Sequence, residues 1–267
     1  MELFLDSSNP REIEEATHWG LLTGVTTNLT LIPQAGRDMK QSLGEILDAS
    51  PGPVMVQVVG WHESKTMIAQ AKQLHSYSDR IIVKLPISIA GIQALLNLKQ
   101  EIPELQITVT CVSSIAQAYL SGKAGADIVA LFNGPFDLVS DTPVDLVSPV
   151  RKIFDNYGFR TKILACGRFP RLFGDFAVAG ADMCTMKIQY MRMLYEHPFT
   201  ESRMNGFLRR TVGARRVAGD DFMRQVERGH DRDAFRADDL AGLTDLPHLA
   251  IQQLGRCQEG IQLMGAA

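Results

Sequence analysis

The feature that most constrains the fold is a regular alternation of short apolar runs with amphipathic stretches along most of the chain. We predict strands near residues 2–6, 23–26, 53–58, 81–85, 105–110, 127–132, 161–165 and 182–186, with helices between them. Runs this short and apolar are typical of parallel strands that are buried on both faces. Eight β-α units of this kind within about 200 residues predict an α/β fold, the (β/α)8 TIM barrel.

The competing α/β fold is a doubly wound open sheet, which is expected to carry a glycine-rich phosphate loop after an early strand. Neither GxGxxG nor GxxxxGK followed by Ser or Thr occurs in the sequence, so we favour the barrel. We expect residues 1–200 to form the barrel and residues 201–267 to form a C-terminal helical extension.

Local signals agree with this order of elements. Asn9 and Pro10 precede an amphipathic stretch as an N-cap and a first helical residue, with Glu12 at the third helical position. Ser114 is a typical cap for a helix that begins at Ile115. The sequence Ala-Gly-Ala-Asp occurs twice, and each time we expect the glycine to end a helix just before a strand.

Composition excludes several classes of protein. The 267 residues are 45% hydrophobic and 21% charged, with a net charge of -3, which is typical of a globular protein and not of a general nucleic-acid binder. No apolar stretch of the sequence approaches the length of a membrane span. Residues 1–6 lack the basic region and apolar core of a signal peptide, so we expect a cytoplasmic protein.

Cysteine and histidine usage gives two further expectations. The cysteines have no CxxC spacing, so we expect free thiols in a reducing compartment; they are Cys111, Cys166, Cys184 and Cys257. The six histidines form no HExxH or comparable cluster, so the sequence predicts no metal site.

Lys84 is the residue that points most directly to chemistry. It lies in the run Ile-Ile-Val-Lys-Leu-Pro at 81–86, which is predicted to be a buried strand. Burial favours the neutral form of an amine, and a neutral amine can attack a ketone to form a Schiff base. The structural alternative is a lysine at a strand end whose head group reaches water.

Polar residues gather at the predicted carboxyl ends of the strands, where a (β/α)8 barrel places its reactive groups. They are Asp6, Thr26, Asn28, Gln57, Lys84, Thr108, Thr110, Asn133, Cys166, Arg168, Thr185 and Lys187. The aromatic Phe132 lies at the same end of its strand, next to Asn133. Each has a structural explanation alone, as a cap, a turn residue, a satisfied core amide or a good strand former. Together, a carboxylate, an amide, hydroxyls and a lysine at one barrel mouth suit Schiff-base carbonyl chemistry.

Several segments resemble the transaldolase family, and within it the small branch that includes fructose-6-phosphate aldolase. They are MELFLD at 1–6, GVTTN at 24–28, QV at 57–58, VKLP at 83–86, Thr110 with AQ at 116–117, GAD at 125–127, and the stretch 180–198. The resemblance covers roughly residues 1–205, a length that suits a (β/α)8 domain.

The resemblance implies a mechanism in which Lys84 is the Schiff-base lysine and Asp6 the general acid/base. Gln57 and Thr110 match the pair that orients the catalytic water. In that mechanism Lys84 condenses with a ketose, Asp6 acts through water on the C4 hydroxyl, and the C3–C4 bond breaks. The dihydroxyacetone enamine left on the lysine then passes to an acceptor aldehyde. The imine is the electron sink, so the resemblance implies no metal and no organic cofactor.

The resemblance also implies how a sugar or sugar phosphate would be held. Thr26 and Asn28 match residues that contact substrate hydroxyls, and Arg168 matches a residue that binds the substrate phosphate. Phe132 stands where transaldolases carry phenylalanine and free aldolases of the family carry tyrosine, whose phenol would help to protonate the enamine. This favours transaldolase activity, with a dihydroxyacetone-type aldolase as the alternative.

Phosphate recognition is where the chain departs from the family. The segment NGPFD at 133–137 lacks the arginine usual there, and Cys166, a weak donor, replaces a serine that helps to hold phosphate. Either Lys187 and Arg168 rebuild an anion site, or the enzyme acts on a non-standard sugar. The structural alternative for Lys187 is a surface lysine.

The tail after residue 205 has no clear counterpart in the family. The segment 203–216 carries five arginines and no acidic residue. Small-branch members use a C-terminal helix to clasp a neighbouring subunit, which implies a homo-oligomer, whereas the structural alternative is a solvated, salt-bridged helix pair. A hypothesis of a different class is a non-catalytic oligomeric scaffold. We expect no nucleic-acid partner and no membrane partner.

Overall fold

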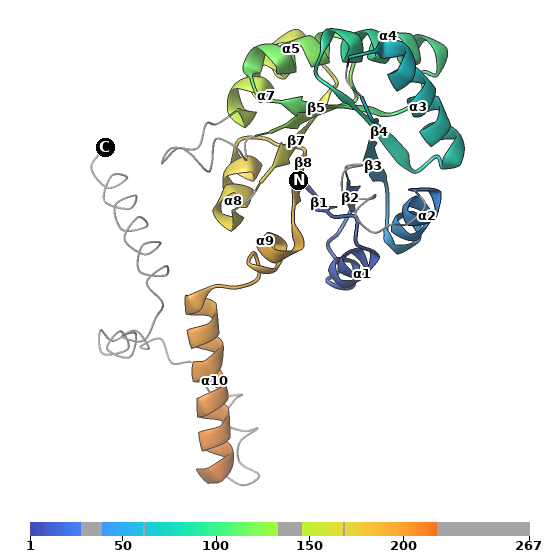
Figure 1. Ribbon diagram of the computed structural model, residues 1–267. Helices are drawn as coiled ribbons and strands as arrows, with labels where there is room; N and C mark the ends of the chain where they lie inside the picture. Colours follow the sequence, from blue (N-terminus) through green and yellow to red (C-terminus); the bar gives the residue numbers. More distant parts are fainter. Residues whose placement is uncertain (28–38, 61, 133–145, 168, 218–267) are drawn as a thin grey trace, which may run out of the picture. The chain divides into compact units, whose positions relative to one another are not determined.

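The computed structural model describes residues 1–27, 39–60, 62–132, 146–167 and 169–217. It separates into two compact units, Met1–Tyr195 and Glu196–Ala267. In the first unit, eight parallel strands close into a barrel in chain order, and helices lie around the outside (Figure 1). The second unit contains the helix α10 (Pro198–Val217). The fold is therefore the predicted TIM barrel, with a C-terminal helix.

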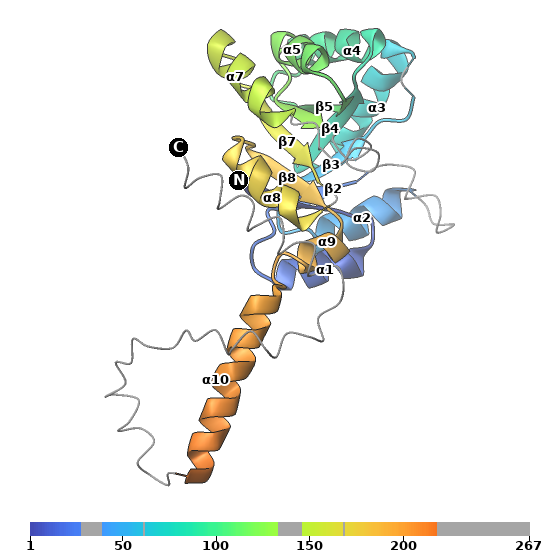
Figure 2. The same cartoon turned by 90° about the vertical axis from the view of Figure 1, so that its left-hand side faces the viewer.

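The elements alternate as the sequence pattern predicts. The strands are β1 (Glu2–Asp6), β2 (Gly24–Thr26), β3 (Val54–Gln57), β4 (Ile81–Pro86), β5 (Ile107–Val112), β6 (Ile128–Leu131), β7 (Lys162–Cys166) and β8 (Met183–Met186). The helices of the barrel unit are α1 (Pro10–His18), α2 (Met39–Ala49), α3 (Ser64–Tyr77), α4 (Ile89–Glu101), α5 (Ile115–Lys123), α7 (Val147–Tyr157), α8 (Pro170–Val178) and α9 (Ile188–Arg192). Figure 2 shows the barrel from the side, with helices flanking its strands. Within the described residues, no helix has both the length and the apolar character needed to cross a bilayer.

An apolar layer fills the inside of the barrel. Its members, drawn from six strands, are Phe4, Met55, Ile82, Ile128, Ala130, Leu164 and Met183. A larger cluster of buried side chains packs the outer faces of the strands against the helices. Because side chains alternate along a strand, the residues two positions after Phe4 and Ile82 face the same interior. The apolar layer is therefore the floor of the opening that holds Asp6 and Lys84.

The predicted helix starts are confirmed at α1 and α5. The Asn9 side chain accepts a hydrogen bond from the backbone N–H two residues later (3.1 Å), and Pro10 is the first helical residue. The Ser114 side chain caps α5 by accepting the backbone N–H of Gln117, three residues later (3.2 Å). Glu12 accepts the Ser7 hydroxyl (2.5 Å), and Ser7 Oγ in turn accepts the Asn9 N–H. Ser7 therefore fills the place in the N-terminal network that a capping box would give to Glu12.

The two Ala-Gly-Ala-Asp segments have the same structure. Gly125 and Gly180 follow the last turn of α5 and α8 with φ of 83° and 88°, a conformation that glycine adopts without strain. The Asp127 carboxylate then accepts the first backbone N–H of β5 (2.7 Å), and the Asp182 carboxylate accepts the second backbone N–H of β7, that of Ile163 (2.6 Å). Each acidic residue therefore fastens its own strand to the start of the preceding strand.

The largest shift from prediction is at β5, which was expected at 105–110 and is observed at Ile107–Val112. Leu105 is buried, with 1% of its surface exposed, but it packs into the core from the turn before the strand. At the other end, Cys111 has a φ of 63° and the register with β6 shifts. Neither the buried leucine nor the cysteine at the bulge is a residue type that marks a turn, so the sequence pattern did not reveal where the strand begins and ends.

Gly24 in β2 is a position where the barrel tolerates no side chain. A Cβ atom there would lie 2.4 Å from the Pro53 carbonyl oxygen and 2.7 Å from Phe4 Cε1. We predict that Gly24→Ala lowers the free energy of unfolding by about 1–3 kcal/mol, because Phe4 and the backbone must move. Urea unfolding of the full chain, followed by circular dichroism, measures this loss.

Gly174→Ala in α8 is the matched control. A Cβ atom at Gly174 meets nothing within 4 Å, and alanine favours a helix over glycine by about 0.5–1 kcal/mol. We expect this variant to be as stable as the wild type or more so. A Gly24→Ala protein that unfolds at the wild-type urea concentration would contradict the packing described for the barrel interior.

Candidate active site

The Lys84 amine lies inside the barrel. Its side chain projects from the middle of β4 and the residue is only 9% exposed. The Nζ atom donates a hydrogen bond to the backbone carbonyl of Thr27 (3.2 Å), which follows β2. On β4 the register places Lys84 between Gln57 of β3 and Thr108 of β5. The amine is thus held above the apolar layer and away from bulk solvent.

The Asp6 carboxylate ends β1 and is partly buried. Its Oδ1 atom accepts a hydrogen bond from the Thr26 hydroxyl (3.2 Å). The same Thr26 oxygen lies 2.7 Å from Thr185 Oγ1 of β8. Asp6 is therefore tied to both of the strands that flank β1 in the closed barrel.

The Cys166 thiol is influenced by the charges of both Lys84 and Asp6. Desolvation raises the pKa of the Cys166 thiol to about 12, while the Lys84 charge lowers that pKa and the charges of Asp6 and Cys111 raise it. Both Lys84 and Asp6 thus act on one sulfur atom, at the carboxyl end of β7. The thiol is neutral at physiological pH, and it packs against the apolar layer.

Gln57 and Thr110 border the same opening. Gln57 is the last residue of β3, directly beside Lys84, and is partly buried. Thr110 is 6% exposed and lies beside Pro86 of β4. The left-handed Cys111 follows it, and a bulge of this kind re-aims the side chains next to it.

The remaining predicted residues differ in how closely they approach this opening. Phe132 follows β6 and is 39% exposed, with its N–H bonded to the β5 backbone. Lys187 follows β8 at the start of α9, and its side chain is exposed. Asn28, Arg168 and the segment 133–137 lie outside the described residues. In the part of the chain that is described, no three His, Cys, Asp or Glu side chains are grouped to hold a metal ion.

Two contributors were not among the predicted site residues. Thr27 accepts the Lys84 hydrogen bond through its backbone carbonyl, and every residue type has such a carbonyl, so the sequence gives no sign of this role. Thr185 was noted only as the end of a predicted strand, but it lies beside Cys166 in the register of β7 and β8. The signal that identifies Thr185 is the two-residue spacing from Met183, which faces the barrel interior.

Comparison with known proteins agrees with this geometry. The family model described as Transaldolase/Fructose-6-phosphate aldolase matches residues 3–240 of the chain. The chain belongs to the transaldolase/fructose-6-phosphate aldolase family. The resemblance seen in the sequence is thereby confirmed.

Relatives of this transaldolase-family chain align along nearly their whole length. A probable transaldolase of Aquifex aeolicus is 38% identical over 210 residues, which are 78% of this chain and 95% of the relative. A probable transaldolase of Coprothermobacter proteolyticus is 37% identical over 209 residues, with the same shares of 78% and 95%. One from Maridesulfovibrio salexigens is 38% identical over 208 residues, which are 78% of this chain and 96% of the relative. The rest of this chain lies outside these alignments.

The raised pKa values make a prediction about thiol reactivity in this family member. Alkylation requires the thiolate, and the pKa is raised to about 12 by burial for both Cys166 and Cys184. We expect iodoacetamide at pH 8 to modify the exposed Cys111 long before either of them. Mass spectrometry of peptides from the intact, folded protein measures the three rates.

The pH dependence supplies the control. The thiolate fraction of a group with a pKa of about 12 rises about tenfold for each pH unit below that value, so labelling of Cys166 should accelerate from pH 8 to pH 9 in that proportion. Labelling of Cys166 at pH 8 as fast as that of Cys111 would contradict a neutral, desolvated thiol in the barrel mouth.

Proposed function

We propose that the barrel, residues 1–200, is a transaldolase that transfers a dihydroxyacetone unit from a ketose donor to an aldehyde acceptor. The observation that carries this proposal is the buried Lys84 amine at the barrel mouth, beside a thiol on which the Asp6 charge also acts. An amine that is shielded from water, near a carboxylate that can move a proton, is suited to carbonyl chemistry. Family membership supports the same reaction.

The first step forms the Schiff base. Lys84 Nζ attacks the C2 ketone carbon of the donor, and the carbinolamine then loses water to give an iminium ion. The Thr27 carbonyl accepts one amine hydrogen, which limits the orientations that the amine can take. Gln57 and Thr110 border the amine with an amide and a hydroxyl, the groups needed to hold the water that leaves and later returns.

The second step breaks and remakes a carbon–carbon bond. Asp6, through a water molecule, accepts the proton of the C4 hydroxyl, the C3–C4 bond breaks, and the aldehyde half leaves. The electron pair of that bond moves into the iminium ion and leaves a neutral enamine on Lys84. When C3 attacks an acceptor aldehyde, Asp6 returns the proton to the new hydroxyl, and water hydrolyses the iminium ion. Electrons and protons balance without an external oxidant.

Phe132 supports transfer over free aldol cleavage. It follows β6 at the same end of the barrel as Lys84, and it is partly exposed there. A phenylalanine has no proton to give to the enamine. The enamine should therefore persist until an acceptor aldehyde enters, which is the behaviour of a transferase.

Helix α10 and the free thiols support two further features of this enzyme. The helix exposes Phe199, Met204, Phe207 and Leu208, which suit burial against another copy of the chain in a homo-oligomer. Residues 201–267 would then serve assembly. The described cysteines are free thiols, which fits a cytoplasmic enzyme.

Borohydride trapping tests the proposed function directly. We predict that wild-type protein, incubated with fructose 6-phosphate and then reduced, gains a three-carbon adduct at Lys84 that peptide mass spectrometry detects. Lys84→Met keeps a side chain of similar length without the amine, so it should gain no adduct and lose about 10³-fold or more in kcat. Asp6→Asn should lower kcat about 10²–10⁴-fold and trap the intact donor in place of the fragment.

Two controls define the result. The acceptor erythrose 4-phosphate should remove the three-carbon unit from wild-type protein before reduction and release the ketose product. A wild-type protein that traps none of a panel of ketoses, with or without phosphate, would refute the enzyme and favour the non-catalytic scaffold. Rapid release of dihydroxyacetone without an acceptor would favour the aldolase.

A second candidate, a transferase for a non-standard sugar without phosphate, is favoured by the environment of Cys166. The resemblance places a phosphate-holding serine there, whereas this chain has a neutral thiol that packs on apolar side chains. A thiol is a weak hydrogen-bond donor, so it stabilises a phosphate less than a hydroxyl does. Lys187, which could replace the missing arginine as a cation, follows β8 and is exposed.

Exchange of the thiol for a hydroxyl tests whether residue 166 lies against the phosphate of a bound sugar. We predict that Cys166→Ser lowers the KM for fructose 6-phosphate about tenfold, because one hydrogen bond to a charged group is gained. The KM for fructose should not change. An equal effect on both sugars, or none, would mean that residue 166 does not contact the phosphate.

A further inference from the structure

A chain of two buried hydroxyls ends on the Asp6 carboxylate. Thr185 Oγ1 lies 2.7 Å from Thr26 Oγ1, and Thr26 donates to Asp6 Oδ1 at 3.2 Å. Thr26 is 2% exposed and Thr185 is 5% exposed, so little water competes for these bonds. The hydroxyl of Thr185 is therefore linked to the carboxylate without touching it.

The direction of the chain follows from the number of hydrogens. A threonine hydroxyl carries one hydrogen and can accept two hydrogen bonds. The Thr26 hydrogen points to Asp6, because an ionised carboxylate can only accept. The hydrogen between the two threonines must then come from Thr185. The donors run from Thr185 to Thr26 to Asp6, and each bond polarises the next in a dry environment.

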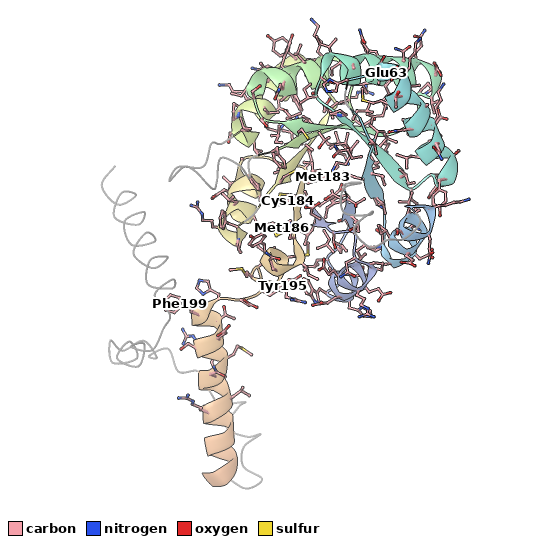
Figure 3. All side chains as sticks on the ribbon, in the orientation of Figure 1. Glu63, Met183, Cys184, Met186, Tyr195 and Phe199 are labelled. Carbon is pink, nitrogen blue, oxygen red and sulfur yellow. The ribbon has the colours of Figure 1, made fainter. Side chains whose placement is uncertain are left out.

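Barrel closure is what brings these three residues together. Asp6 lies beside Thr26 in the register of β1 and β2, and Thr185 lies beside Phe4, one layer below, in the register of β1 and β8. Figure 3 labels Cys184 and Met186, the neighbours of Thr185 in β8. Both of these neighbours belong to the buried cluster that packs outside the barrel, so Thr185 between them faces inward.

We infer that Thr185 is a positioning residue for the proposed reaction: through Thr26 it fixes one oxygen of Asp6, so that the other oxygen can face the water that relays the substrate proton. This inference rests on the proposed function. The bond from Thr26 to Asp6 is long, at 3.2 Å, so its direction depends on what holds the Thr26 hydroxyl. Thr185 supplies that hold with the shorter bond. Without it the Thr26 hydroxyl can turn, and Asp6 can rotate away from the C4 hydroxyl.

Three substitutions at one position test this role. Thr185→Val keeps the shape of the side chain and removes the hydroxyl. We expect kcat for transfer to fall about tenfold, the range of a mispositioned proton-transfer group, with KM unchanged. Thr185→Ser and Thr185→Ala differ only by the hydroxyl, so the serine variant should stay within about twofold of wild type while the alanine variant falls with the valine variant. The serine–alanine pair carries the test if the valine variant does not fold.

A structural effect is separated from a positioning effect by two readouts. Borohydride trapping at Lys84 should remain at the wild-type level in Thr185→Val, because Asp6 acts after the Schiff base forms. Thr161→Val is the matched control: Thr161 is buried just before β7, at the other end of the strands, and its hydroxyl donates to the Ala126 carbonyl (2.7 Å) instead of linking to Asp6. We expect its kcat to stay within about twofold of wild type.

The possible failures are distinguishable. If wild-type protein traps no ketose, the proposed function fails, and the role of Thr185 fails with it. If wild type is trapped but Thr185→Val and Thr185→Ala keep the wild-type kcat, the inference alone is overturned. It is also overturned if the serine variant falls as far as the alanine variant, or if trapping falls in proportion to kcat.

Discussion

The pairing of β1 with β8 is the contact on which the rest of this molecule depends. It closes the sheet, so that Thr185 near the end of the barrel sequence lies beside Phe4 near its beginning. In an open sheet the first and last strands need not meet, and Asp6 would have a neighbour on one side only. Closure also turns the carboxyl ends of all eight strands toward a single opening. The site is therefore a property of the whole ring and not of any one motif.

Within that ring, desolvation and charge act together. The apolar layer removes water from beneath Lys84, and backbone and hydroxyl groups with fixed positions take its place around the amine and the carboxylate. Such groups need no reorganisation when charge moves during a reaction, which is the main advantage of an enzyme site over water. The neutral Cys166 thiol at the end of β7 adds no further charge to this environment.

Most of the barrel could be predicted from the sequence, because short apolar runs separated by amphipathic stretches leave few alternatives to parallel strands joined by helices. The shift of β5 could not, since Leu105 is as apolar as a strand residue and Cys111 carries no turn signal. At the site, Lys84 stood out as a charge within an apolar run, and Asp6 stood out as a charge at the end of one. The link from Thr185 to Asp6 depends on a register across the closure, and the Thr27 carbonyl belongs to the backbone, so neither leaves a trace in residue types.

The apolar layer determines from which end of the barrel small molecules can enter and leave. At the amino end of the strands lies a depression lined in part by Glu2, Phe4, Ile82 and Lys162. Phe4 and Ile82 also belong to the layer beneath Lys84, so a single layer of apolar side chains separates the two ends of the barrel. The opening that holds Lys84 is closed at its base, so in the proposed reaction the donor, the released aldehyde and the water for hydrolysis all pass through one entrance. In that reaction the first aldehyde must leave through this entrance before an acceptor aldehyde can enter.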